Sequence, residues 1–175
     1  MKKLHIGCGS AKLKGYVGLD IDPRSEAEVI HDLEKFPYPF KSNEFDEVFA
    51  EHVMEHLDNI PGVMEELHRI LKKGGKVIIH GPHFSSVDMF TDPTHKHFMT
   101  SRTFDYFCKN SPFFDWHYAK TEFKKNKVTL GPPKPANILL RLILSFLNRH
   151  QLLYERRFAF IFPVGVIDYE LEVVK

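Results

Sequence analysis

The stretch LHIGCGSAKLKGYVGLDID, residues 4–22, decides the fold. A short apolar run ends at Gly7-Cys8-Gly9, and a second run, residues 16–21, carries Asp20 near its end. Glycine permits a sharp turn and a close approach of backbone to a ligand. A parallel α/β sheet binds ligands beyond the carboxyl ends of its strands. The stretch therefore predicts a nucleotide-type site at the turn after the first strand.

The turn lacks what a dinucleotide needs. Lys12 occupies the position of the third fingerprint glycine, and residues 10–15 are too few for a useful helix. A pyrophosphate would lose the helix N-terminus that stabilises its charge. Asp20 also comes earlier than the usual spacing of about 20 residues. A ligand without phosphates, whose ribose diol meets Asp20, fits these features; a tight strand turn with a capping aspartate is the alternative.

Composition narrows the class of protein. The chain has 175 residues, which suits one domain, and its 24 Lys and Arg nearly balance its 23 Asp and Glu. That balance demands neither nucleic acid nor an anionic membrane as partner. Two cysteines do not make a disulfide framework, and no apolar run is long enough for a signal peptide or a membrane span. We expect a cytoplasmic protein without a transmembrane segment that binds no nucleic acid.

Apolar patterning predicts one α/β domain. Strands are expected over residues 3–6, 16–21, 28–31, 45–51, 76–80, 123–130 and 164–174. Helical spacing of apolar residues predicts a helix over 59–71, stopped by Gly74 and Gly75. A second helix is expected over 101–108, with Ser101 as its N-cap. A strand, a helix and a further strand in succession imply a right-handed parallel crossover.

Four segments, in order, carry a family resemblance: LHIGCGS, GLDID, HDLEKFPYPFKSNEFDEVFAEHVMEHL and ELHRILKKGGKVII. Over roughly residues 1–110 the chain resembles the class I S-adenosylmethionine-dependent methyltransferases, in particular the methyltransferase type 11 group. The resemblance implies a Rossmann-like, doubly wound α/β sheet of seven strands, mostly parallel with an antiparallel last strand. Here the first crossover is shortened. We expect a single domain, residues 1–175, with a cofactor half (1–81) and an acceptor half (82–175).

The same resemblance implies the function and the cofactor site. The chain would transfer a methyl group from S-adenosyl-L-methionine to a small molecule or a lipid-like cell-envelope precursor. Asp20 would accept both ribose hydroxyls, and Asp32 would accept from the adenine amine unless it caps a helix. Lys12 and Lys14 are candidates for the cofactor carboxylate, whereas Asp46 and Glu66 are interpreted as solvated or capping charges. The residues assigned to the cofactor are Gly7, Cys8, Gly9, Asp20, Ile21, Asp32, Leu33, Glu51 and His52.

Eleven histidines raise the question of a metal. Residues 52–56, HVMEH, match the H-x-x-E-H pattern, in which two histidines on a helix hold zinc. His52, however, lies at the end of a strand, and no downstream Glu on a long helix offers a third ligand. We therefore assign no metal ligand. A metal-dependent hydrolase remains an alternative function, as does a nucleoside-binding protein without catalysis.

The segment GPHFSSVDMFTDPTHKHF, residues 81–98, follows the fifth strand onto the binding edge of the sheet. Three interpretations compete: a pocket for the methyl acceptor, a metal site, and a loop whose polar side chains satisfy its own backbone. We favour the acceptor pocket. His83 or His95 would take a proton from the acceptor, and Asp92 would orient that histidine.

The segment ILLRLILSFL, residues 138–147, is apolar on nearly every side. It suits a core helix, a face that pairs two copies of the chain, a lid over an apolar acceptor, or a surface membrane anchor. Its length is that of a buried helix rather than of a membrane span. We favour a core helix or a homodimer face.

Overall fold

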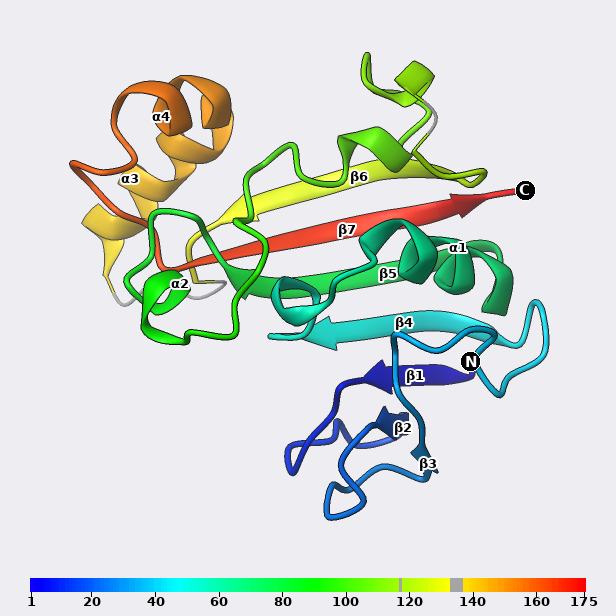
Figure 1. Cartoon of the computed structure of the whole chain (residues 1–175). Coiled ribbons are helices and arrows are strands. Elements are labelled where there is room, and N and C mark those ends of the chain that lie inside the picture. The colour runs from blue at the N-terminus through cyan, green and yellow to red at the C-terminus, as the bar shows by residue number, and fades with distance from the viewer. Residues whose placement is uncertain (117, 133–136) are drawn as a thin grey trace.

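The computed structural model describes residues 1–116, 118–132 and 137–175. Seven strands form one sheet, in the order β3-β2-β1-β4-β5-β7-β6 (Figure 1). The strands are β1 Lys3–Ile6, β2 Val17–Asp20, β3 Val29–Ile30, β4 Phe45–Glu51, β5 Leu71–Pro82, β6 Glu122–Leu130 and β7 Val166–Val174. The helices are α1 Ile60–Ile70, α2 Asp88–Thr91, α3 Ile138–Arg149 and α4 Gln151–Arg157, with short 3-10 turns η1 Met54–His56, η2 Asp105–Phe107 and η3 Phe114–Trp116.

The sheet has the predicted topology. Strands β3, β2, β1, β4 and β5 are parallel neighbours, and β7 runs antiparallel between β5 and β6. The mostly parallel sheet with an antiparallel last strand is thus confirmed, and each predicted strand is present. The strand order reverses where β1 lies beside β4, and such a switch point is where open α/β sheets bind their ligands.

The first crossover is short, as predicted. Residues 7–16 form turns instead of a helix, and Gly7 and Gly9 adopt left-handed backbone angles, with φ of +60° and +50°. The connections 21–28 and 31–44 also contain no helix. Among the parallel connections from β1 to β5, all of them described, only that from β4 to β5 contains a helix, α1.

The strand order is that of a doubly wound sheet, as expected, although most of the crossovers contain no helix. Along β7, alternate side chains are buried: Ile167, Tyr169, Leu171 and Val173. The intervening residues face the other side and are polar, with Glu170 paired to Lys76 on β5 at 2.9 Å. Alternation of this kind is typical of an antiparallel strand with one solvated face. In β1, by contrast, the consecutive residues Leu4, His5 and Ile6 are all buried, so this part of the sheet is covered on both faces. The core packs against α1, which lies in front of β5 (Figure 1), and it includes side chains of η2 and α4 such as Phe107 and Tyr154.

Helix α1 begins where the sequence predicts. The Asn59 side chain accepts a hydrogen bond from the Gly62 amide at 2.9 Å and caps the helix. The helix ends at Ile70 because Leu71 is already extended and pairs with Phe45. Its end was predicted one residue later, and Gly74, with φ of +74°, bends the backbone within β5 rather than ending α1.

Two further expectations are corrected. Residues 101–108 form only the turn η2, because the Ser101 hydroxyl donates to Glu155 at 2.8 Å instead of capping a helix. In α3, Leu144 alone is buried, whereas Leu139, Leu142 and Phe146 are each more than 60% exposed. The core interpretation of residues 138–147 is therefore wrong. Among the described residues, no helix is long and apolar enough to cross a membrane.

Candidate functional site

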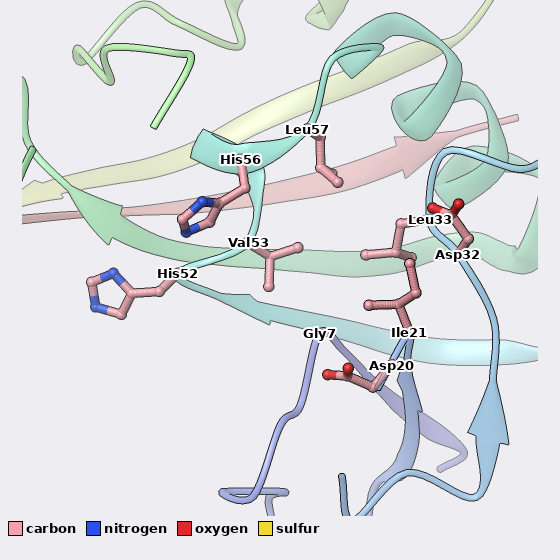
Figure 2. A pocket seen from close by; sticks show the side chains of 9 residues that line it. All are labelled: Gly7, Asp20, Ile21, Asp32, Leu33, His52, Val53, His56 and Leu57. Atoms are coloured by element: carbon pink, nitrogen blue, oxygen red, sulfur yellow. The ribbon is translucent and has the colours of Figure 1, made fainter. Parts of the chain in front are cut away.

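A pocket of about 260 Å³ lies at the carboxyl ends of β1, β2 and β4. Its lining residues are Gly7, Asp20, Ile21, Asp32, Leu33, His52, Val53, His56 and Leu57. Figure 2 shows Asp32 and Leu33 at one end and two histidines, His52 and His56, at the other, with Asp20 beside Gly7 between them. Six of the nine residues assigned to the cofactor therefore meet in one pocket, at the switch point of the sheet.

Asp20 connects the pocket to the glycine turn. Its carboxylate is 8% exposed and accepts hydrogen bonds from the Gly9 amide at 2.8 Å and the Asp22 amide at 2.9 Å. A carboxylate has about four acceptor positions, so two remain for a diol. The side chain thus holds the turn in place and keeps capacity for a ligand hydroxyl.

Gly7 is required by the space around it. A β-carbon built on Gly7 would lie 2.3 Å from Cγ2 of Val53. The backbone φ of Gly7 is +60°, an angle at which any residue with a side chain would be strained. Val53 comes from the segment after β4, so the glycine lets the two strand ends approach each other. This approach forms the floor of the pocket.

The other end of the pocket is apolar with one carboxylate. Ile21 is 64% exposed at the rim, and Leu33 is buried, with its carbonyl accepting from the Tyr38 hydroxyl at 3.0 Å. Asp32 accepts from the Glu34 amide at 3.0 Å within a turn that no helix follows. The helix-cap alternative for Asp32 is therefore wrong.

Three assigned residues do not line the pocket. Gly9 contributes its amide to Asp20, while the Cys8 thiol is buried towards Gly18, and burial raises its pKa. Glu51 is exposed and stands beside His80 in the β4–β5 ladder. The position of Lys12 likewise argues against a role at the cofactor carboxylate, because its ammonium pairs with Glu28.

His52 lies on the rim with a charged partner beneath it. Its φ is +51°, and its Nδ1 lies 3.2 Å from Oε1 of Glu55, which is completely buried. This hydrogen bond raises the pKa of His52, and partial burial opposes the rise. The imidazole is therefore held in one orientation with its Nε2 turned away from Glu55.

The three predicted catalytic residues lie in different environments. His83 is fully buried, with Nδ1 at 2.8 Å from Ser85 and Nε2 at 3.4 Å from Glu155, and it does not line the pocket. Asp92 is exposed and accepts from the amide and hydroxyl of Thr94, which lowers its pKa. The His95 ring lies 4.6 Å from that of His56, so the loop after β5 does reach the pocket.

Sequence reasoning missed Val53, His56 and Leu57 as lining residues and Glu55 as the partner of His52. All four belong to HVMEHL, residues 52–57, which turns through η1 directly after β4. The H-x-x-E-H pattern is the signal in the sequence that points to these residues, although His52 precedes any helix. A turn at a strand end can nevertheless bring these side chains together.

Comparison with solved structures defines the class first. An S-adenosylmethionine-dependent methyltransferase of Archaeoglobus fulgidus superposes with a TM-score of 0.65 at 17% identity, covering 98% of this chain and 85% of that one. One from Mesorhizobium loti superposes with a TM-score of 0.61 at 14% identity, covering 98% and 90%. These likenesses show that the chain has the class I methyltransferase fold.

The sequence match is more specific and covers the pocket. Residues 4–79 match the model of the type 11 methyltransferase domain family. This matched segment contains every lining residue of the pocket. Residues 4–79 are thus similar to a methyltransferase domain, and the two solved structures that share the fold are S-adenosylmethionine-dependent methyltransferases. A sterol 4-C-methyltransferase of Caenorhabditis elegans is 29% identical over 70 residues, which is 40% of this chain and 20% of that protein. The chain thus spans about a fifth of the length of this curated relative.

Proposed function

We propose that this chain transfers a methyl group from S-adenosylmethionine to a small or lipid-like acceptor. The observation that carries the proposal is the pocket itself, which sets the Asp20 carboxylate beside Gly7 and has no phosphate-binding helix. Adenosine would extend from Asp20 towards Leu33 and Asp32. The sulfonium end would lie towards His52 and His56.

In this proposal the protein contributes chiefly by positioning. Sulfonium already activates the methyl carbon, so an in-line acceptor held at the histidine end needs little further help. A hydroxyl or amine acceptor must lose a proton, and His52, oriented by Glu55, is the exposed imidazole on that rim. We propose His52 as the general base, in place of His83.

The acceptor would come from the side of residues 82–100, in keeping with a division into a cofactor half (1–81) and an acceptor half (82–175). The similarity to a sterol methyltransferase supports a lipid-like acceptor. The two unpaired cysteines, Cys8 and Cys108, support a cytoplasmic location.

Calorimetric titration with S-adenosylmethionine tests the cofactor site. Asp20→Asn keeps the shape of the side chain and removes its charge, so we expect binding about 10- to 100-fold weaker, as for loss of a charged hydrogen bond. Asp22→Asn is the matched control, because Asp22 pairs with Arg24 at the surface. Equal binding by wild type and Asp20→Asn would sink the proposal.

Turnover separates the alternatives. Methyl transfer from labelled cofactor to a panel of hydroxyl, amine and sterol acceptors is expected, and it should fall in His52→Ala. Binding without transfer to any acceptor would favour the nucleoside-binding alternative. Hydrolysis of test esters that depends on added metal, with no cofactor binding, would favour the hydrolase.

The exposed face of α3 is proposed to pair two copies of the chain. Replacing Leu142 and Phe146 by Lys should abolish concentration-dependent association in sedimentation experiments while cofactor binding stays intact. A wild-type chain that is monomeric at all concentrations would contradict the dimer and leave the lipid-like acceptor as the occupant of this face.

A further inference from the structure

We infer that Glu55, His56 and His95 form a binding site for a divalent first-row transition-metal ion at the acceptor end of the pocket. This inference rests on the proposed function for its role but not for its geometry. One potential ligand atom from each of the three residues lies within 4.8 Å of the others. The set differs from the H-x-x-E-H prediction, because a loop histidine, His95, takes the place of His52.

The first observation that points to a cation is the state of Glu55. This side chain is completely buried, Oε1 meets His52 at 3.2 Å, and Oε2 has no hydrogen-bond partner among the described residues. Burial of a carboxylate oxygen without a partner is costly. A bound cation would satisfy this oxygen.

The second observation concerns which nitrogen of His56 is available. Its Nδ1 lies 2.9 Å from the Thr94 hydroxyl, and that hydroxyl donates its own proton to Asp92 at 2.7 Å. The Thr94 oxygen must therefore accept from His56, which places the proton on Nδ1 and a lone pair on Nε2. Metal-binding histidines usually have this arrangement, with the second nitrogen donating to an outer partner.

His95 also has its proton on Nδ1, in this case because of a hydrogen bond to a backbone carbonyl. Its Nδ1 lies 3.1 Å from the Met89 carbonyl, which can only accept, so Nε2 again carries the lone pair. The backbone of its loop is fixed to the other ligand segment, because the Lys96 and His97 amides donate to the Glu55 carbonyl at 2.7 and 3.2 Å. The DPTH turn and the HVMEH turn are thus joined into one structure.

The ligand chemistry selects the type of ion. Two imidazoles and one carboxylate suit zinc, iron, cobalt or nickel rather than magnesium or calcium, which prefer oxygen ligands. Three protein ligands leave coordination positions open for a substrate. His56 lines the pocket, so the open coordination positions of the ion would lie next to the histidine end, where the sulfonium group and methyl transfer are proposed.

This placement predicts an acceptor with an oxygen that coordinates the ion. A coordinated hydroxyl loses its proton more readily, and the proton would pass to Nε2 of His52. An oxygen lone pair then forms the new bond to the methyl carbon, while the electron pair of the carbon–sulfur bond returns to sulfur. The products are a methyl ether, S-adenosylhomocysteine and a protonated His52.

Metal titration of chelator-treated protein tests the site without the cofactor. We expect equilibrium dialysis to show close to one Zn²⁺ per chain and Co²⁺ to give an absorption spectrum of bound imidazoles. Glu55→Gln and His95→Ala should each weaken Zn²⁺ binding by about tenfold or more. His97→Gln is the matched control in the same loop, since glutamine can still donate to the Leu57 carbonyl that His97 contacts.

Further measurements keep the outcomes separable. Zn²⁺ should raise the melting temperature of the wild type but not of His95→Ala, whose loop position leaves the core intact. Acetohydroxamate should change the Co²⁺ spectrum by entering open positions. Asp20→Asn should bind Zn²⁺ like the wild type, so failure of the cofactor site would leave this result unchanged. Absence of stoichiometric binding, or equal binding in both ligand variants, would overturn the inference.

Discussion

The imidazole of His80 on β5 donates a hydrogen bond through Nδ1 to the Asp168 carboxylate on the antiparallel neighbour β7. The two residues stand opposite each other in the ladder, and the His80 ring lies 5.3 Å from that of His52. The bond to Asp168 raises the pKa of His80 above its ordinary value of 6.5, and partial burial opposes the rise. The polar face of the sheet thus supports the histidine rim of the pocket.

This pair makes stability depend on pH in a defined direction. The folded state holds the His80 proton more tightly than the unfolded state. The pair therefore contributes its full stabilisation at pH values below the pKa of His80 in the unfolded chain, and this stabilisation is lost as the pH rises through the pKa of His80 in the folded protein. We expect Asp168→Asn to lower the pKa of His80 and to remove this contribution. Histidine NMR titration measures the pKa, and Glu170→Gln on the same strand should leave it unchanged.

Glu66 on α1 is a structural residue rather than a solvated charge. Its carboxylate accepts from the Tyr38 amide at 2.8 Å and from both Nε and Nη2 of Arg69, at 2.8 and 2.7 Å. Removing one partner of a buried pair leaves the other uncompensated. We expect Glu66→Ala to lower the free energy of unfolding by about 3 kcal/mol in urea denaturation.

The adjacent residue provides the control for this prediction. Glu65 is exposed, and among the described residues its carboxylate accepts one hydrogen bond, from the Lys120 amide at 3.1 Å. Glu65→Ala should change the free energy of unfolding by about 0.5 kcal/mol or less. Equal effects at the two positions would show that the Glu66 pair contributes nothing specific.

Gly7 tests the close approach of the strand ends. Gly7→Ala should cost about 1–2 kcal/mol for the left-handed backbone and more for the contact with Val53, and it should weaken cofactor binding. Gly15→Ala separates the two causes, because Gly15 has φ of +83° but nothing within 4 Å of its built β-carbon. Adding Val53→Ala to Gly7→Ala should recover part of the loss, as measured by thermal unfolding.

Glu155 distinguishes a structural His83 from a catalytic one. The carboxylate accepts from the Ser101 amide at 2.6 Å and lies 3.4 Å from His83, joining α4 to the loop after β5. Glu155→Ala should therefore destabilise the fold by about 2 kcal/mol or more and leave cofactor affinity unchanged below its melting temperature. Arg156→Ala, on the exposed side of α4, is the control. An intact melting temperature with lost methyl transfer would restore His83 as the base.

Much of the fold could be predicted because its signals are local. Short β-branched runs between glycines and prolines predict the strands, and Asn59 before an apolar stripe predicts the start of α1. The glycine turn and the short link before Asp20 predict the ligand-binding edge of the sheet, since they act through backbone angles of neighbouring residues. The end of α1 and the absence of a helix at 101–108 are less predictable, because they depend on contacts with residues far away in the sequence. Leu71 pairs with Phe45, and Ser101 donates to Glu155.

By itself the sequence determined the strand segments, the glycine turn and the acid that follows it, since these depend on residues adjacent in the chain. Only the tertiary structure decided that one face of β7 is polar, that Glu66 is buried, and that α3 exposes its apolar side chains. It also brought His95 beside His56 and Glu55, about 40 residues earlier in the chain. The reason is physical: local patterns limit backbone angles, whereas contacts between distant segments follow from how the sheet and its loops pack.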